Sequence, residues 1–368
     1  MDAAESRPAA TNGVVHVIDR ACPPEALEEA LLLARPGEKI ICIGPLPESR
    51  VSPLESAPVT KVSLTELEFH PEKVPADLRG GRVVYQCWSV QAGWHVRAFL
   101  SDESAPIALR LARPPSEAEA GQLLELAGDG KLAVACPTKF IAARLPTADL
   151  AAEVHVIPPP GEVDAAARSD ASRRSRLRQQ LGIAASQVAI AAPGPVHRGS
   201  GHRYAVWAMA ILVVGELPVR LIVPHTGREA RDVVEFARQA GFGQQTLLAE
   251  LRLADVLAAA DVAVFLDAAS CPPMPTAAAM CAGLPIVAAR TPAAGEWLID
   301  GRNALLVAPE EPRATARALM HVVEDKALAA ELGNSARSSA VGKFDLESVR
   351  RRWEQLRACL QSPPAAEA

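Results

Sequence analysis

The sequence contains few aromatic residues and no strong excess of charge of either sign. Phe, Trp and Tyr make up 4% of the 368 residues, so a folded core has to consist mainly of aliphatic side chains. The 38 Lys and Arg residues face 43 Asp and Glu residues, which gives a formal net charge of −5 at pH 7. A chain without net positive charge has no global field that attracts nucleic acid or an anionic membrane. We therefore expect no nucleic-acid partner and at most peripheral contact with a membrane.

Cysteine pairs, metal-ligand spacings and long hydrophobic runs are also missing. The seven cysteines are scattered without a C-x-x-C pair, which is typical of buried reduced thiols. The eight histidines show no metal-ligand spacing, so we expect no metal ion. No stretch of about 18 apolar residues occurs, and the first residues lack a basic segment followed by an apolar run. These absences predict a cytoplasmic protein without a resident metal.

What the sequence does contain is a series of short apolar runs that alternate with helical patterns. Hydrophobic residues make up 49% of the chain, and its length suffices for two domains with a core each. Nearly all-apolar strands are what a parallel sheet buried on both faces requires. The sequence therefore predicts an α/β fold with two Rossmann-like, doubly wound domains. The expected strands are 14–18, 39–43, 82–88, 107–110, 132–136 and 153–157, followed by 187–192, 219–223, 246–249, 262–266, 286–289 and 304–307.

The stretch 261–307 is the most informative part of the chain. It reads as strand, loop, short apolar helix at about 276–282, a Gly-Leu-Pro turn and a second strand, which is a βαβ unit. Residues 279–288 (AMCAGLPIVA), followed by Gly295–Glu296 and 300–303 (DGRN), resemble the donor-sugar half of the family 4 glycosyltransferases. The resemblance covers 13–360 and is strongest from Val188. It implies GT-B architecture, with two Rossmann-like domains facing across a cleft, and a retaining, nucleotide-sugar-dependent, metal-independent sugar transfer.

The same resemblance suggests how the chain is divided. Residues 158–164 (PPPGEVD) are similar to the turn that leads from the acceptor domain to the donor domain of the family. We expect a flexible tail at 1–12, an N-terminal acceptor-side domain at 13–160 and a C-terminal donor domain at 161–345. A last helix at 346–360 is expected to pack back on the N-terminal domain.

The loop 193–201 (PGPVHRGSG) is a candidate diphosphate site. It joins the strand 187–192 to a helix at 202–212, and three glycines there aim amides and a positive helix end at an anion. In the family, an arginine and a lysine of this loop grip the diphosphate, and here Pro195 and Ser200 stand at their positions. Two nearby arginines, or the Ser200 hydroxyl, could substitute for them. The candidate donor residues of this segment are Gly194, Arg198, Ser200, Gly201 and Arg203.

Two family glutamates that hold the donor sugar and the ribose are also replaced, by Ser270 and Ala278. Asp267 could reach the ligand instead, or it could cap a turn. Glu296 matches a family glutamate close to the donor, and its alternative role is to stabilise its own helix. Ser270 and Glu296 complete the candidate donor site.

The carboxyl end of the strand 82–88 is the candidate acceptor surface, because ligands bind outside the carboxyl ends of strands in open α/β sheets. Trp88, Trp94 and His95 lie there, and the tryptophans could either stack on a sugar or pack in the core. The first strand is followed by 20–24 (RACPP) and not by G-x-G-x-x-G, which argues against a dehydrogenase. No nucleophile or base can be named from the sequence.

One basic run, 168–180, could touch phosphate or an anionic membrane surface, or form a solvated helix face. Two functional hypotheses remain. The first is a glycosyltransferase that binds a nucleotide-sugar and an unknown acceptor. The second is a catalytically inactive relative that acts as a binding or regulatory module for a protein partner, because all four charged donor-site positions of the family are replaced.

Overall fold

The computed structural model describes residues 13–22, 25–44, 59–63, 66, 67, 70, 83–100, 105–128, 131–161 and 170–361. The expected tail at 1–12, the prolines at 23 and 24 and the last three residues of the boundary turn 158–164 lie outside the described residues. The chain forms two compact units. The first comprises Met1–Cys136, Arg144–His155 and Trp353–Ala368, and the second comprises Pro137–Ala143 and Val156–Arg352.

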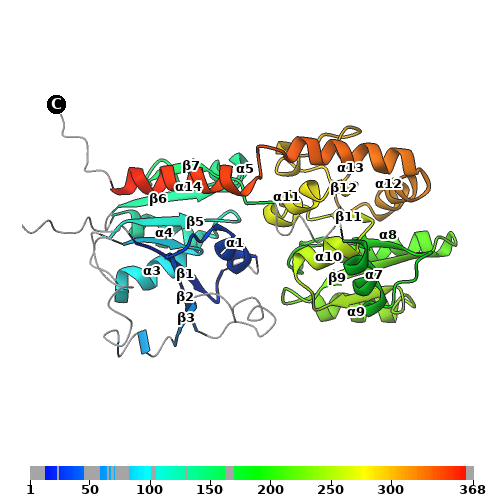
Figure 1. Cartoon of the computed structure of the whole chain (residues 1–368), viewed down its shortest axis with the longest axis horizontal. Helices are drawn as coiled ribbons and strands as arrows, with labels where there is room; N and C mark the ends of the chain where they lie inside the picture. The colour runs from blue at the N-terminus through cyan, green and yellow to red at the C-terminus, as the bar shows by residue number, and fades with distance from the viewer. Residues whose placement is uncertain are drawn as a thin grey trace, which may run out of the picture. The chain divides into compact units, whose positions relative to one another are not determined.

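The first unit is built on a seven-stranded sheet in the order β3-β2-β1-β4-β5-β6-β7 (Figure 1). Neighbouring strands from β3 to β6 run parallel, and Val17 at the centre pairs with Ile41 on one side and Cys87 on the other. The strands are β1 Val14–Asp19, β2 Lys39–Ile43, β3 Val59–Val62, β4 Val84–Cys87, β5 Ile107–Arg110, β6 Leu132–Cys136 and β7 Glu153–Val156.

The second unit is built on a six-stranded parallel sheet in the order β10-β9-β8-β11-β12-β13. Ile190 in its centre pairs with Leu221 and Val262. The strands are β8 Val188–Ala191, β9 Val219–Pro224, β10 Thr246–Ala249, β11 Val262–Phe265, β12 Ile286–Ala289 and β13 Leu305–Val307.

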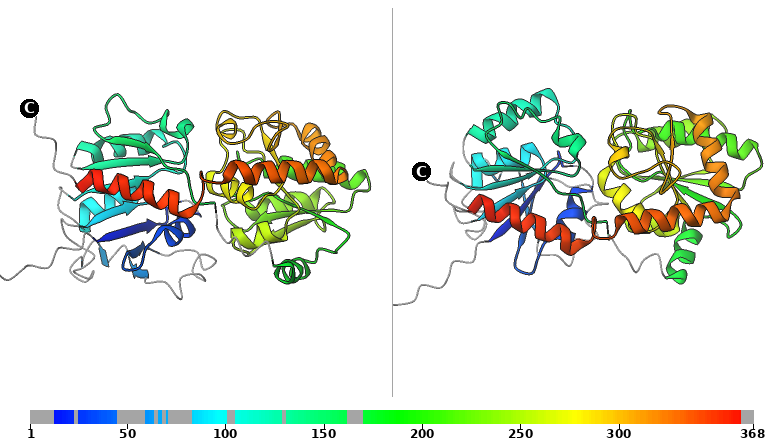
Figure 2. Two further views of the ribbon diagram at one scale, coloured as in Figure 1. Left: turned by 45° about the horizontal axis from the view of Figure 1, so that its top comes forward. Right: turned by 90° about the horizontal axis from the view of Figure 1, so that it is seen from above.

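Helices connect the strands of both sheets (Figure 2). Those of the first unit are α1 Ala26–Leu33, α3 Val90–His95 with a π-helical continuation to Leu100, and α4 Glu117–Gly128. Those of the second unit are α5 Lys139–Ala142, α7 Ala171–Gln180, α8 His202–Val214, α9 Ala230–Gln239, α10 Leu253–Ala259, α11 Pro273–Cys281, α12 Pro312–Glu324 and α13 Lys326–Ala340. The last helix, α14 Leu346–Gln361, begins in the second unit and continues in the first.

These observations confirm the predicted fold class of two parallel-sheet, Rossmann-like α/β domains. Every expected strand is present within two residues at each end, and β2, β5, β6, β10 and β12 match in full. The sequence analysis missed β3 and the helices α4, α5, α9 and α10.

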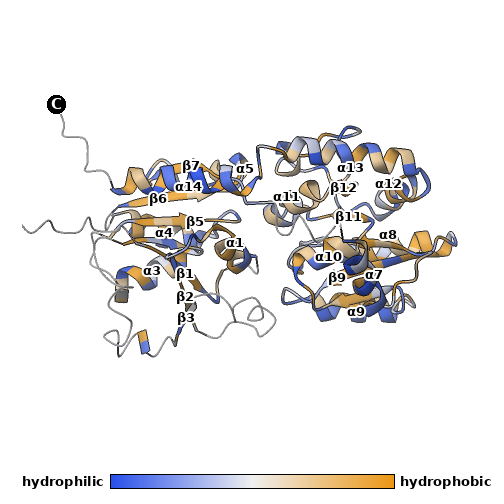
Figure 3. Cartoon of the chain, in the orientation of Figure 1, coloured by the Kyte–Doolittle hydropathy of each residue, from blue (hydrophilic) through white to orange (hydrophobic). Residues whose placement is uncertain are grey.

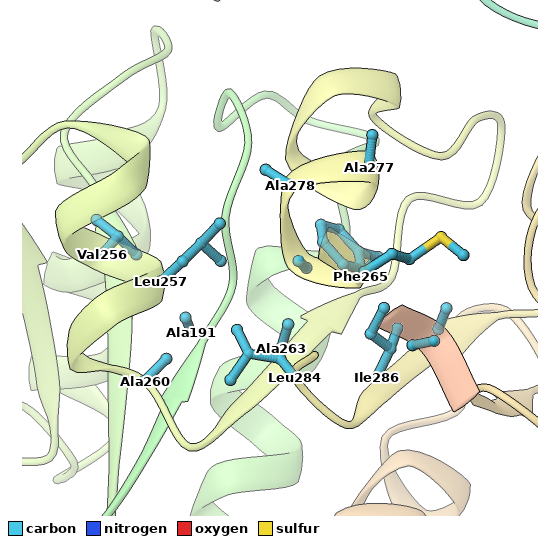
Figure 4. Packing of buried hydrophobic residues seen from close by; sticks show 14 of the residues in the cluster. Ala191, Val256, Leu257, Ala260, Ala263, Phe265, Ala277, Ala278, Leu284 and Ile286 are labelled. Atoms are coloured by element: carbon cyan, nitrogen blue, oxygen red, sulfur yellow. The ribbon is translucent and has the colours of Figure 1, made fainter. Parts of the chain in front are cut away.

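Small side chains allow close packing in the second unit. Its main core cluster contains fully buried alanines on β8, β11 and α11, including Ala191, Ala263 and Ala277 (Figure 4). Alanine loses no side-chain entropy on burial and lets helix and sheet backbones approach each other. This packing explains how a chain with few aromatic residues builds an aliphatic core.

The C-terminal part of α14 covers a polar face of the first sheet. Arg357 donates to the Gln86 side-chain carbonyl on β4 at 3.1 Å, and the Trp353 ring lies 6.1 Å from that of Trp88. His16 on β1 pairs with Glu38 at 3.1 Å, and burial lowers the pKa of the fully buried His16 below its usual value. Helix α14 thus joins the first unit through hydrogen bonds and ring contacts.

The basic run forms α7, and its arginines bind within the second unit. Arg174 and Arg178 both pair with Asp261, at 2.7 and 2.9 Å, and Arg173 pairs with Asp255 at 2.5 Å. The expectation of a solvated or anion-binding face is therefore wrong for these three residues. Arg176 remains exposed and contacts Ser172 on its own helix.

Candidate functional site

The chain leaves two central strands of the second sheet in opposite directions along the sheet. From β8 the chain moves to β9 and β10 on one side, whereas β11, β12 and β13 continue on the other. The point between β8 and β11 is therefore a topological switch point, where open α/β sheets bind ligands. The chain segments that leave these strands are the loops 192–201 and 266–272. They are the candidate donor site.

Two glycines allow these loops to pack against each other. Gly194 has φ +123°, and a Cβ there would lie 3.2 Å from Pro272 Cγ. Gly201 has φ +76°, and a Cβ there would lie only 2.2 Å from the Leu266 carbonyl oxygen. Both glycines that the sequence analysis placed in the donor site are thus required by backbone geometry.

The Ser200 side chain faces the protein and not a ligand. Its Oγ accepts a hydrogen bond from the His197 amide at 3.0 Å and lies 2.7 Å from His202 Nδ1. His202 Nε2 lies 2.9 Å from the Ala192 carbonyl oxygen, which can only accept, so Nε2 carries the proton and Nδ1 is an acceptor. The single Ser200 hydroxyl proton has two acceptors within reach, Nδ1 and the His197 carbonyl oxygen at 2.6 Å. The Ser200 hydroxyl therefore stabilises the loop, whereas the sequence analysis expected it to bind the diphosphate.

Burial keeps the His202 imidazole neutral. The residue is 6% exposed, and desolvation lowers its pKa to about 4 against the opposing effect of the Ala192 carbonyl. Sequence analysis did not identify this residue. The only available signal was its position as the first residue of a helix that follows a glycine-rich loop.

The cations near the loop lie on its exposed side. Arg198 is exposed, whereas the Arg203 guanidinium lies 5.6 Å from the centre of the Phe236 ring on α9. The His197 ring is 54% exposed, and its Nε2 lies 3.4 Å from Asp267 Oδ2. Arg198 is therefore exposed where a ligand anion could bind, whereas His197 pairs with Asp267 and Arg203 contacts an aromatic ring.

Asp267 is a turn cap. Its Oδ1 accepts hydrogen bonds from the amides of Ala269 and Ser270, both at 2.8 Å. Burial opposes ionisation, but His197 and these two amides lower the pKa of the carboxyl below its usual value. Asp267 thus has the second of the two roles that the sequence left open, since it caps a turn.

The two positions of the missing family glutamates differ in exposure. Ser270 is half-buried beside Asp267, where a side chain can meet a ligand. Ala278 is 1% exposed and belongs to the core of the second unit (Figure 4). A carboxylate at 278 would be buried there, so no ribose contact is available from this side chain.

Glu296 binds a helix N-terminus and not its own helix. Its two carboxylate oxygens accept from the amides of Lys139 and Phe140 at 2.9 and 2.5 Å, at the first turn of α5. Thr138 caps the same helix through the amide of Ile141. A carboxylate at a helix N-terminus is stabilised by the unpaired amides and the helix dipole. Glu296 therefore has a structural partner in place of the expected donor contact.

The first sheet has its own switch point, between β1 and β4. Asp19 ends β1 and is 1% exposed, and its Oδ1 accepts from the amides of Ala21 and Cys22 and from the Ser89 hydroxyl at 2.9 Å. Within the part of the chain that the structure describes, its Oδ2 has no hydrogen-bond partner, and it lies 3.9 Å from His95 Nε2 on α3. Sequence analysis found His95 but missed Asp19, because the contact joins residues 76 positions apart.

The two tryptophans do not form an exposed platform. Trp88 is 2% exposed and stacks on His16 with ring centres 6.1 Å apart, so the packing alternative applies to it. Trp94 is half-buried, and its indole nitrogen is buried. Of the three residues predicted for the acceptor surface, His95 is thus the one whose side chain could act as an acid or a base.

The described residues contain no group of three or more His, Cys, Asp and Glu side chains that could hold a metal ion. In the same part of the chain, no helix is both long enough and apolar enough to span a bilayer.

Comparison with known proteins places this geometry in context. Residues 188–325 match the sequence model of the family described as glycosyl transferases group 1. A D-inositol 3-phosphate glycosyltransferase of Xylanimonas cellulosilytica is 31% identical over 210 residues, which are 54% of this chain and 49% of that protein. The match therefore spans about half the length of this curated relative.

Solved structures resemble nearly the whole chain. Anabaena HepE in complex with UDP and glucose has a TM-score of 0.75 at 18% identity, with 94% of this chain and 99% of HepE covered. Sucrose-phosphate synthase from Thermosynechococcus elongatus has a TM-score of 0.68 at 17% identity, with 95% and 99% covered. The chain therefore has the GT-B fold of glycosyltransferases, and its second unit carries the group 1 glycosyl transferase sequence pattern.

Proposed function

We propose that the protein is a retaining, metal-independent glycosyltransferase that binds a nucleotide-sugar at the switch point of its second unit. The observation that carries this proposal is the glycine loop 193–201, which packs against 266–272 inside the segment that matches the family. The HepE structure of similar fold contains UDP and glucose. A nucleoside diphosphate sugar is therefore the donor class that best fits this loop.

The diphosphate would be bound by backbone amides and the exposed Arg198 guanidinium. Helix α8 begins at this loop, and its positive end favours an anion. Arg198 supplies side-chain charge from the loop itself. If the two family cations were not replaced, the loss of about 3 kcal/mol of transition-state stabilisation from each would slow transfer by about four orders of magnitude.

Arg198→Ala should weaken nucleotide diphosphate binding by about 10- to 100-fold, because a charge-assisted hydrogen bond to phosphate is lost. Isothermal calorimetry with UDP, GDP and ADP in the absence of metal measures this effect directly. We expect micromolar affinity of the wild-type protein for one of the three.

Arg176→Ala is the matched control, since Arg176 is an exposed arginine of the same unit on α7. It should leave nucleotide affinity unchanged. Absence of binding to any nucleotide at millimolar concentration would contradict donor use and favour the inactive, partner-binding relative. Equal affinity of Arg198→Ala and wild type would remove Arg198 from the site.

The acceptor hydroxyl is proposed to bind at His95, beside Asp19. It would donate its one proton to His95 Nε2, and the Asp19 carboxylate lies 3.9 Å from that nitrogen. Neutral His95 would accept this proton as the hydroxyl oxygen bonds to C1 of the donor sugar, while the bond from C1 to the diphosphate oxygen breaks and the nucleoside diphosphate leaves with the electron pair. Asp19, whose Oδ2 is buried without a hydrogen-bond partner among the described residues, would stabilise the resulting imidazolium.

His95→Gln should lower the rate of sugar transfer by about 100-fold, because general-base catalysis of this kind contributes 10²-fold or more. Donor affinity in calorimetry should stay within about twofold. Transfer is measured with the nucleotide-sugar that binds and a panel of sugars, polyols and their phosphates as acceptors.

Asp19→Asn tests the positioning role separately. Loss of the Asp19 charge should move the acidic limb of the pH–rate profile to lower pH, because the imidazolium loses its partner. His155→Gln, which makes the same substitution at a histidine on β7, serves as the control for His95→Gln. An unchanged rate in His95→Gln would rule out this base while leaving the donor proposal intact.

A further inference from the structure

Helix α8 has apolar side chains on its outer face as well as on the inner face that packs in the core. Its inner face, which includes Val206 and Met209, lies in the core of the second unit. Its outer face exposes Trp207, Ile211 and Val214 by 46%, 42% and 76%. These are three of the six large hydrophobic side chains that are exposed among the described residues. Figure 3 draws the C-terminal half of the helix in the hydrophobic colour. A helix that is hydrophobic all round is normally buried on all sides.

A groove adjoins this outer face. Helices α8 and α12 border a cavity of 510 Å³, to which Ile211, Leu217 and Met320 contribute apolar surface. Trp207 is held at the edge of the helix by an edge-to-face contact with Phe236, with ring centres 5.5 Å apart. The result is a continuous apolar surface with a preorganised tryptophan, which is typical of an interface centre.

The charges around the groove lie on α12 and on the residue before it, and they have both signs. Glu311 precedes the helix, Arg313 and Arg317 lie in its first half, and Glu324 is its last residue. All four are exposed, and none has an ion-pair partner among the described residues. Arg317 and Glu324 are seven positions apart, which corresponds to about 10 Å along a helix. When two such helices lie antiparallel, the arginines of one face the glutamate of the other.

We propose that the outer face of α8 and the groove beside α12 form the interface with a second copy of this chain. In a two-fold symmetric dimer one patch meets itself, so a surface with separated basic and acidic ends is complementary to its own copy. Trp207, Ile211 and Val214 form the apolar centre. Arg313 and Arg317, with Glu311 beside them, and Glu324 at the other end of α12 form a charged rim. An anionic membrane would require an excess of positive charge, which this rim of two arginines and two glutamates lacks. The proposal does not depend on the activity.

Sedimentation velocity of the full chain at 1 to 100 μM, chosen as about the range in which dimers of standard interface size associate, tests this proposal. The wild-type protein should sediment as a dimer. Val214→Glu places a charge in the apolar centre and should weaken the dimer by about 100-fold or more. Val214 is 76% exposed, so the substitution leaves the core of the monomer intact.

Val341→Glu is the matched control, because Val341 is 78% exposed and lies at the end of α13. It should remain a dimer. Arg317→Glu should dissociate the dimer, and the addition of Glu324→Arg should restore it, since the two charges exchange roles across the interface. A monomeric wild-type protein at 100 μM, dimers that persist in Val214→Glu, or a failed charge exchange would each overturn the proposal. Association with a different protein in place of self-association would do the same.

Discussion

Gly201→Ala should destabilise the second unit by about 3 kcal/mol or more. The new Cβ would lie 2.2 Å from the Leu266 carbonyl oxygen and 2.4 Å from its carbonyl carbon. Both are backbone atoms, which cannot move aside without separating the two loops. The positive φ of +76° adds strain of about 1 kcal/mol for a residue with a side chain. Scanning calorimetry should show a lower unfolding temperature, and calorimetric titration should show loss of nucleotide binding, because the donor loop is displaced.

Gly241→Ala separates steric overlap from backbone strain. Gly241 also belongs to the second unit and has φ +87°, but a Cβ there would meet nothing within 4 Å. This control should lose only about 1 kcal/mol. Similar losses in the two variants would mean that the loops 192–201 and 266–272 do not pack as closely as the structure shows.

His202 should make the second unit sensitive to mild acid. Burial lowers its pKa from 6.5 to about 4, so the unfolded chain takes up a proton at a pH where the folded chain does not. The contribution of neutral His202 to the free energy of unfolding is therefore complete above pH 6.5, and it decreases as the pH falls toward 4. A difference of 2.5 pH units corresponds to about 3 kcal/mol of unfolding free energy.

His202→Gln should flatten this dependence. The Gln amide can still donate to the Ala192 carbonyl, but it has no proton to gain. Urea denaturation at intervals between pH 7 and pH 4 should show a smaller decrease for the variant by about 3 kcal/mol. His16 lies in the first unit and titrates equally in both proteins, so its contribution cancels in the difference. Parallel curves would show that His202 is protonated or exposed in the folded protein.

The sequence predicted the sheets well because each buried strand is a short apolar run bounded by proline, glycine or charge. The amphipathic periods of residues 312–324 and 326–340 also predict two helices at roughly these positions, and α12 and α13 have these bounds. Strand β3 was missed because VTKV contains two polar residues and follows a stretch without periodicity. Helix α10 was missed because it is short and precedes the strand β11 without a glycine or proline between them.

The site was harder to predict than the fold because side-chain roles depend on distant contacts. Glu296 was expected at the donor, yet its partner amides lie 156 and 157 positions away on α5. Asp19 and Ser89 meet across 70 positions, and no local pattern connects them. Ser200 is different, since its partner His202 is two residues away and a local hydrogen bond was a readable alternative to phosphate binding.

The hydrogen bonds between Glu296 and the N-terminus of α5 affect how the protein can be divided into fragments. Residues 137–143 belong to the second unit, although the chain on either side of them belongs to the first. A fragment that starts at the sequence-based boundary near 160 would lack α5 and leave the Glu296 carboxylate without its two amide donors. A fragment that ends there would also lack the part of α14 that carries Trp353 and Arg357. No single cut in the chain releases either unit whole.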